Sequence, residues 1–253
     1  MEQSINIMAT RIADILRDHN PSIFLFGSVV LDDFRLGWSD IDIICLTGEK
    51  IREQQANELV SLRQTLLLEY PGNSYFRLFE GGMLTLDAFL RGMEDTVVYW
   101  GTSGQRITNR YGLCAFSKME LIDNGKLLHG NDFRHLLSYP ARAEIVSAIE
   151  AHYRTIRQHG KSGGGWFLDI ARCLYTLKTS KIIAKTKVGE WAIAQNLCPD
   201  ISVMKKIIEI RKNPHMLEAE ETKQWLAALE QHIQRFADVL ENELKNHPHN
   251  STA

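Results

Sequence analysis

The hydrophobic pattern of this chain changes once, at Pro140, and that change limits the folds it can adopt. Before Pro140, short apolar runs bounded by turn residues alternate with amphipathic segments, a pattern typical of strands mixed with helices. After it, apolar residues recur only at helical spacing. The sequence therefore predicts an α+β fold, with a mixed sheet and covering helices in residues 1–139 and an all-helical domain in residues 140–253.

The pattern also predicts where the elements of each domain lie. In the first domain we expect helices over 2–18, 51–70 and 117–124, and strands over 23–26, 41–46, 76–79, 83–90 and 127–128. Residues 97–110 are expected to form a loop. In the second domain we expect helices over 141–158, 166–179, 187–196, 202–212 and 217–245, followed by a polar, frayed tail over 247–253.

Charge and composition narrow the possible partners. Lys and Arg total 29 against 31 Asp and Glu, and a protein that binds long nucleic acid usually carries a basic excess. The N-terminus lacks the pattern of a signal peptide, and no apolar run approaches the ~18 residues that a membrane span needs. We therefore expect a cytoplasmic monomer or weak dimer with small-molecule partners.

A glycine–serine turn and two nearby carboxylates form the most informative motif. Gly27 and Ser28 follow the predicted strand 23–26, and Asp40 and Asp42 enter the strand 41–46 after eleven further residues. Residues two apart in a strand project to the same side, so the two carboxylates would lie together. Because like charges repel, this arrangement predicts a hard divalent cation shared between Asp40 and Asp42.

The glycine–serine turn suits the phosphates of a nucleotide. A glycine lets the backbone approach a phosphate closely, and the N–H groups of the turn and the Ser28 hydroxyl can donate hydrogen bonds to it. Magnesium bound by the aspartates would neutralise charge on a departing pyrophosphate, and a second ion would polarise an attacking hydroxyl. The motif predicts two-metal, in-line transfer of a nucleotidyl group from a triphosphate to a hydroxyl.

A carboxylate is also needed to remove the proton of the attacking hydroxyl. Glu80, just after the predicted strand 76–79 and next to two glycines, is the candidate for general base and third metal ligand. Asp87, in the next predicted strand, is the competing candidate.

The segment 24–47, with its Gly-Ser and Asp-x-Asp, resembles the signature of the polymerase-β-like nucleotidyltransferases. Residues 79–83 resemble the third-carboxylate segment of the aminoglycoside adenylyltransferases that modify spectinomycin and streptomycin, and patches within 170–192 are similar to their C-terminal domain. This resemblance implies ATP as substrate, Asp40 and Asp42 as magnesium ligands, Glu80 as the base, Lys185 on the phosphates, and substrates bound between the domains.

The resemblance also bears on the acceptor. Family members that accept streptomycin carry two acidic residues near the places where this chain has Gln158 and Ser162. The resemblance therefore favours spectinomycin, which would make the protein an antibiotic-resistance enzyme. A lincosamide, a protein or an RNA end are alternative acceptors, and a catalytically silent binding or antitoxin module is the alternative from another class. The near-neutral charge argues against RNA, and the retained carboxylates argue against a silent copy.

Four charged positions have plainer interpretations. Asp32 and Asp33 lie in the connection between the two halves of the motif and are expected to form a solvated turn. Lys185 lies in a lysine-rich stretch, so a solvated helix end is the alternative to a phosphate contact. Arg172 could pair with Asp169 or with Glu190.

Overall fold

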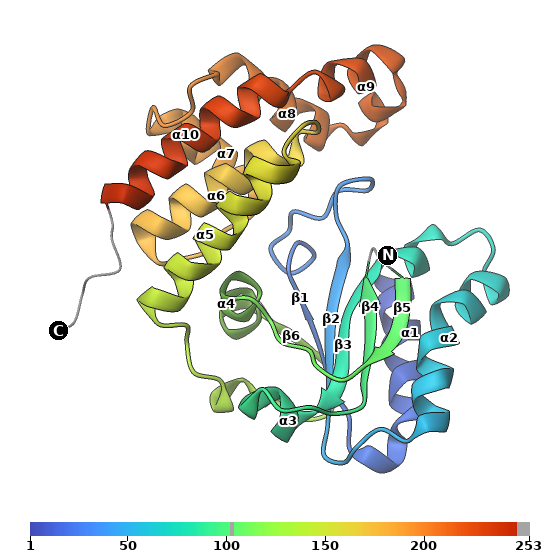
Figure 1. The fold of residues 1–253 in the computed structure, drawn as a ribbon. Coiled ribbons are helices and arrows are strands. Elements are labelled where there is room, and N and C mark those ends of the chain that lie inside the picture. The colour runs from blue at the N-terminus through green and yellow to red at the C-terminus, as the bar shows by residue number, and fades with distance from the viewer. Residues whose placement is uncertain (102–103, 247–253) are drawn as a thin grey trace. The chain divides into compact units, whose positions relative to one another are not determined.

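The computed structural model describes residues 1–101 and 104–246 (Figure 1). Its contacts divide the chain into two compact units. The sheet unit comprises Met1–Val30 and Asp40–Tyr139, and the helical unit comprises Leu31–Ser39 and the chain from Pro140 on. The predicted α+β class is confirmed, with a mixed sheet in one unit and helices in the other. The tail expected to fray, 247–253, lies outside the described residues.

The described part of the sheet unit contains one six-stranded sheet, in the order β5-β4-β3-β2-β1-β6. Strands β2 and β3 run parallel, and the other neighbouring pairs run antiparallel. The sheet is therefore mixed, as predicted. The strands are β1 (Ser22–Phe26), β2 (Ile41–Thr47), β3 (Phe79–Thr85), β4 (Val97–Gly101), β5 (Gly104–Thr108) and β6 (Lys126–His129).

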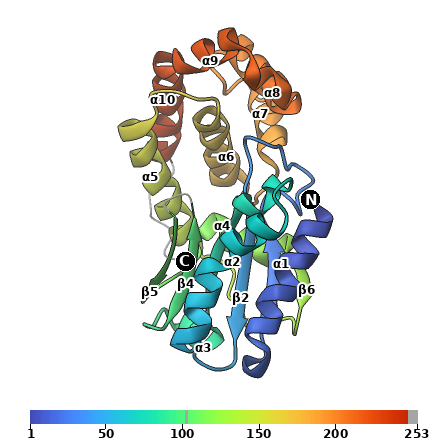
Figure 2. The ribbon, with the colours of Figure 1, turned by 90° about the vertical axis from the view of Figure 1, so that its right-hand side faces the viewer.

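Helices cover both faces of this sheet. On one face α1 (Glu2–Ile15) and α2 (Glu53–Glu69) lie side by side (Figure 2). There the fully buried Trp100 of β4 donates its indole N–H to the carbonyl of Leu59 on α2, at 3.1 Å. On the other face, α3 (Leu86–Arg91) and α4 (Ala115–Asn124) close a core that includes Phe24, Ile44 and Leu121. The 3₁₀ turns η1 (Arg17–His19) and η2 (Ser74–Leu78) complete the layer of α1 and α2.

The two strands predicted over 76–79 and 83–90 are a single strand with other bounds, which contains Phe79 and residues 83–85 of the prediction. The chain instead forms the turn η2, one continuous strand β3, and then the helix α3, whose N-terminus is capped by the Thr85 hydroxyl accepting from the Ala88 N–H. The glycines expected to break the strand lie inside it. Gly81 has φ +149°, and a Cβ there would lie 1.7 Å from the carbonyl oxygen of Ile43. Glycine is used here for the close approach of two strands and not for a turn.

Two further predictions need correction. The expected loop over 97–110 contains the antiparallel strands β4 and β5, with residues 102–103 not described. The single helix expected over 217–245 is three elements: η4 (Pro214–Glu218), α9 (Glu220–Ala227) and α10 (Glu230–Asn246). At the break, the Ala228 N–H bonds to the Trp225 carbonyl three residues back, and Leu229 is buried.

The helical unit packs around α6 (Gly165–Thr179). Phe167 of α6 meets Phe236 of α10 with ring centroids 5.0 Å apart, and both rings are fully buried. The remaining helices are α5 (Arg142–His159), α7 (Lys185–Ala194) and α8 (Ile201–Lys212). Among the described residues, every helix is too short or too polar to cross a membrane.

A buried ion pair fastens the segment Leu31–Ser39 to the helical unit. Asp33 is 3% exposed and accepts hydrogen bonds from the Thr186 hydroxyl at 2.6 Å, the Thr186 N–H at 3.1 Å and the Arg211 guanidinium at 3.0 Å. The predicted solvated turn is therefore wrong for Asp33, whereas Asp32 is exposed. Local turn reasoning could not find partners so distant in sequence.

The surroundings of Asp33 act on its pKa in opposite directions. Burial raises the pKa of the carboxyl, but the hydrogen bonds from Thr186 and the charge of Arg211 outweigh burial and leave the pKa below its ordinary value. A lowered folded-state pKa means that ionised Asp33 stabilises the fold above the unfolded pKa. This stabilisation is lost as the pH falls through the folded pKa.

We predict that Asp33→Ala lowers the free energy of unfolding by about 3–5 kcal/mol at pH 7, because it leaves Arg211 buried without its carboxylate. Urea denaturation measures this change. The control is Glu190→Gln, which breaks the half-exposed pair with Lys212 and should cost less than about 1 kcal/mol. The difference between wild type and Asp33→Asn should shrink below about pH 4. Equal costs for Asp33→Ala and Glu190→Gln would contradict the buried pair.

Candidate active site

The turn after β1 is built around the carboxylate of Asp42. Gly27 has φ +71°, and a Cβ at this position would lie 2.2 Å from Asp42 Oδ2. Only glycine fits there, because any side chain would displace that carboxylate. Next along the turn, the Ser28 hydroxyl donates to the backbone carbonyl of Asp40 at 3.3 Å. The structure thus brings together the two halves of the predicted motif.

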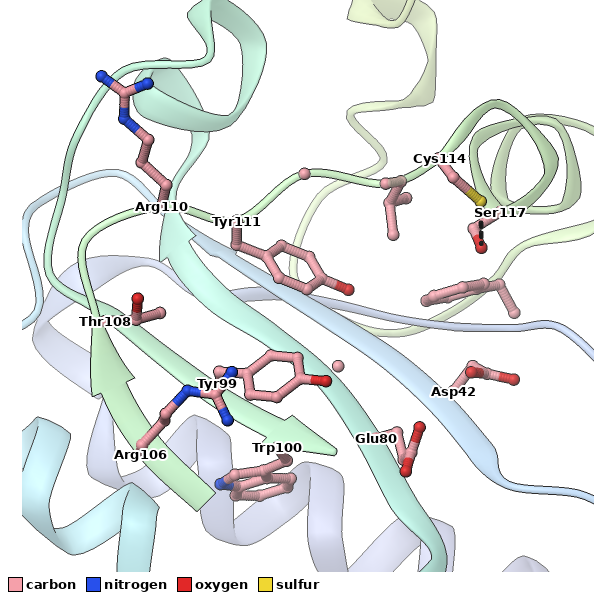
Figure 3. A pocket seen from close by; sticks show the side chains of 14 residues that line it. Asp42, Glu80, Tyr99, Trp100, Arg106, Thr108, Arg110, Tyr111, Cys114 and Ser117 are labelled. Atoms are coloured by element: carbon pink, nitrogen blue, oxygen red, sulfur yellow. Dashed lines mark hydrogen bonds between the residues drawn. The ribbon is translucent and has the colours of Figure 1, made fainter. Parts of the chain in front are cut away.

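Asp42 and Glu80 are neighbours across two parallel strands. Asp42 of β2 pairs in register with Glu80 of β3, so both side chains project from the same face of the sheet. Both line a cavity of about 490 Å³, and Figure 3 shows their carboxylates at one end of it. The sequence predicted Glu80 just after the end of a strand, but Glu80 is the second residue of β3. Asp40 lies just before β2, two residues from Asp42.

These carboxylates suit a magnesium ion that is shared with a nucleotide. Magnesium is usually held by one or two carboxylates, with waters and substrate phosphates completing its shell. Within residues 1–101 and 104–246, no three His, Cys, Asp or Glu side chains are grouped so that they could hold a metal ion, so Asp40, Asp42 and Glu80 are not assembled as a three-ligand site. The glycine at position 27 makes room for the Asp42 carboxylate, because a Cβ there would lie 2.2 Å from Asp42 Oδ2. The donor set fits an ion that the substrate helps to bind.

The competing carboxylate, Asp87, lies elsewhere. It belongs to α3, beyond the far end of β3, and pairs with Arg91 at 2.8 Å with its side chain 58% exposed. The strand register therefore places Glu80, and not Asp87, opposite Asp42.

Two tyrosines and an arginine form the cavity wall, and no sequence motif indicated them. The Arg106 guanidinium lies 4.4 Å from the centre of the Tyr99 ring, and the Tyr99 and Tyr111 rings are 6.2 Å apart (Figure 3). Tyr111 packs on Gly82, where a Cβ would lie 2.4 Å from its ring. Burial and then the negative charge of Asp42 raise the pKa of the Tyr111 hydroxyl, which therefore stays neutral.

Lys185 is the first residue of α7, in the helical unit. Its Nζ lies 3.0 Å from Asp169 Oδ1, which also accepts from Arg172 at 3.0 Å. Arg172 therefore pairs with Asp169, and Glu190 pairs instead with Lys212. The predicted contact of Lys185 with the nucleotide phosphates stays a prediction.

Comparison with known proteins gives a match to a family model and a likeness of fold. Residues 9–71 match the family model of the nucleotidyltransferase domain, a range that contains Gly27, Ser28, Asp40 and Asp42. No curated protein matches the sequence. Two toxin–antitoxin structures, one with AMP-PNP, cover 60% of this chain and 91% of their own at 18% and 16% identity. Their TM-score of 0.27 is too low to indicate a shared fold.

The likeness of fold is to spectinomycin adenyltransferase AAD(9) from Enterococcus faecialis, crystallised with ATP and spectinomycin. That likeness covers 95% of this chain and 99% of the other, with a TM-score of 0.66 and 18% identity. Both findings agree with the resemblance to the aminoglycoside adenylyltransferases. Residues 9–71 thus match a nucleotidyltransferase domain, and the chain is similar in fold to a spectinomycin adenyltransferase.

Proposed function

We propose that this protein is a magnesium-dependent aminoglycoside nucleotidyltransferase that transfers AMP from ATP to a hydroxyl of spectinomycin. The observation that carries the proposal is the pairing of Asp42 with Glu80 beside the Gly27-Ser28 turn, at one end of a cavity. The nucleotidyltransferase family match supports the reaction class. The likeness to an adenyltransferase with ATP and spectinomycin bound supports the substrates.

The donor would lie against the turn after β1. The backbone N–H groups of Gly27 and Ser28 and the Ser28 hydroxyl would donate hydrogen bonds to the triphosphate. Asp40, Asp42 and Glu80 would hold the magnesium, for which we propose two ions. When bound, these ions would neutralise charge on the leaving pyrophosphate and acidify the attacking hydroxyl.

Strand order supports an acceptor site inside the cavity. In-line displacement requires the nucleophile to approach the α-phosphorus opposite the leaving pyrophosphate. The proposed phosphate turn follows Phe26 of β1, and the cavity extends from Phe26 and Asp42 across β3, β4 and β5. A hydroxyl entering there would meet Glu80, which would accept its proton as general base. The Tyr99 and Tyr111 rings would cover the apolar face of a cyclic acceptor.

The resemblance supports spectinomycin over streptomycin, because Gln158 and Ser162 stand near the places where family members that accept streptomycin carry two acidic residues.

Lys185 remains the proposed contact from the helical unit. It begins α7, and the N-terminus of a helix favours anions through its free N–H groups and dipole. The bond to Asp169 would hold its side chain ready for exchange onto a phosphate.

Pyrophosphate release tests the proposed reaction. Purified protein with ATP and Mg²⁺ should release pyrophosphate when spectinomycin is added, and more slowly or not at all with streptomycin or a lincosamide. Asp42→Asn should abolish release while leaving the circular dichroism spectrum and melting temperature unchanged, because the metal and not the core depends on Asp42. If folded wild-type protein released no pyrophosphate with any aminocyclitol, the proposal would fail.

Replacing the proposed base should affect catalysis more than binding. We expect Glu80→Gln to lower kcat roughly 100-fold, the usual scale for a lost general base, with little change in ATP affinity. Steady-state kinetics and calorimetric titration with ATP separate the two effects. Asp87→Asn is the matched control and should keep wild-type kcat. Normal turnover by Glu80→Gln would remove Glu80 from the mechanism.

The turn glycine can be tested against a glycine with the same backbone conformation. Gly27 and Gly92 both have positive φ, but a Cβ at Gly92 would meet nothing within 4 Å. We expect Gly27→Ala and Gly92→Ala each to lower stability by about 1–2 kcal/mol through backbone strain. Only Gly27→Ala should also weaken Mn²⁺ binding, by about tenfold, because it displaces Asp42. Equal Mn²⁺ affinity in both variants would contradict a metal role for Asp42.

A further inference from the structure

Arg63 is a half-buried arginine of α2 that no sequence motif singles out. Its Nη2 donates to the backbone carbonyl of Arg77. Its Nε and Nη1 are shielded from solvent and have no hydrogen-bond partner among the described residues. Burying guanidinium N–H groups without hydrogen-bond partners costs free energy, so a purely structural role explains the position of Arg63 poorly.

The bond to Arg77 lies close to Glu80 along the chain. Arg77 belongs to η2, β3 begins two residues later, and Glu80 follows one residue after that. One turn before Arg63, Leu59 accepts the indole N–H of Trp100. Trp100 pairs with Gly81, the residue after Glu80. Helix α2 is therefore bonded to the backbone three residues before Glu80 and to the side chain of Trp100, whose strand pairs with the residue after Glu80.

Charge links Arg63 to the same site. Burial lowers the pKa of the Arg63 guanidinium, and the negative charges of Glu80 and Asp40 act against that lowering. The attraction is mutual, so the positive charge of Arg63 offsets part of the negative charge of the two carboxylates. This compensation explains how a buried cation with unfilled donors is tolerated beside them.

We propose that Arg63 is a positioning residue for the transfer reaction, an inference that rests on the function proposed above. Its bond to the Arg77 carbonyl sets the start of β3 and with it the carboxylate of Glu80. Its charge limits how tightly Glu80 and Asp40 bind a divalent cation, which keeps the carboxylates available to the substrate as well as to the metal.

The two parts of this role predict a signature that loss of folding would not produce. Arg63→Gln should lower kcat about tenfold or more, with the KM for ATP changed by less than about threefold, because the charge-assisted bond that sets Glu80 is lost. The same variant should bind Mn²⁺ about threefold or more tightly, because a repelling cation is gone. A damaged site would bind Mn²⁺ more weakly. Arg63→Lys should keep wild-type Mn²⁺ affinity and still lose kcat, because lysine retains the charge without the planar fork.

The experiment compares wild type, Arg63→Gln, Arg63→Lys and the control Arg52→Gln. Arg52 lies at the start of the same helix, exposed and paired with Asp18 at 3.9 Å. Melting temperature, Mn²⁺ affinity by electron paramagnetic resonance, and spectinomycin-dependent pyrophosphate release are measured for each. Arg52→Gln should match wild type in all three.

Unchanged kcat in Arg63→Gln, or unchanged or weaker Mn²⁺ binding by that variant, would overturn the inference. If Arg63→Gln does not fold, Arg63→Lys decides, since normal kcat in that variant would also overturn it. If wild type binds Mn²⁺ but transfers nothing to spectinomycin, the acceptor proposal has failed, and the Mn²⁺ affinities still decide the role of Arg63.

Discussion

The in-register pairing of Asp42 with Glu80 on two parallel strands is the constraint on which the candidate site depends. Asp42 and Glu80 are paired in register, so no change of rotamer can move them to opposite faces of the sheet. The backbone around them is correspondingly tight, since side chains at Gly27 and Gly81 would collide with Asp42 and with the Ile43 carbonyl. Two carboxylates held in register favour a cation beside them, which is why we propose magnesium and an anionic substrate at this place.

The fold could be predicted where periodicity carries the signal, as in α2, β2 and most helices of the second unit. The fold could not be predicted where a residue is required by a contact with another residue far away in the sequence. Gly81 and Gly82 were interpreted as a strand break. Gly81 instead leaves room for the Ile43 carbonyl, and Gly82 leaves room for the Tyr111 ring. The reverse error occurred at residues 228–229, where the helix ends without glycine or proline because Leu229 must be buried. Sequence pattern alone does not distinguish these causes.

The same limit applies to the candidate site. Gly27, Ser28, Asp40 and Asp42 lie in one local motif, so sequence alone was enough to single them out, although Asp40 lies just before β2 and not in it as predicted. Tyr99, Arg106 and Tyr111 reach the cavity only because β4 and β5 extend the sheet past β3, and those strands were expected to be a loop. Arg63 approaches Glu80 through the docking of a helix on strands. Such contacts depend on register and packing, which local sequence does not encode.

The eleven residues between Ser28 and Asp40 also have a structural role of their own. Most of the residues between Ser28 and Asp40 belong to the helical unit, and Asp33 anchors them to Thr186 and Arg211. A buried carboxylate that must satisfy two hydrogen bonds from Thr186 and a guanidinium can do so in only one alignment, whereas an apolar contact would tolerate sliding. Thr186 follows Lys185 at the start of α7. Asp33 therefore holds the segment between Ser28 and Asp40 in one position on α7, the helix that begins at Lys185. This polar contact favours a single alignment of the segment over the greater stability that an apolar contact could supply.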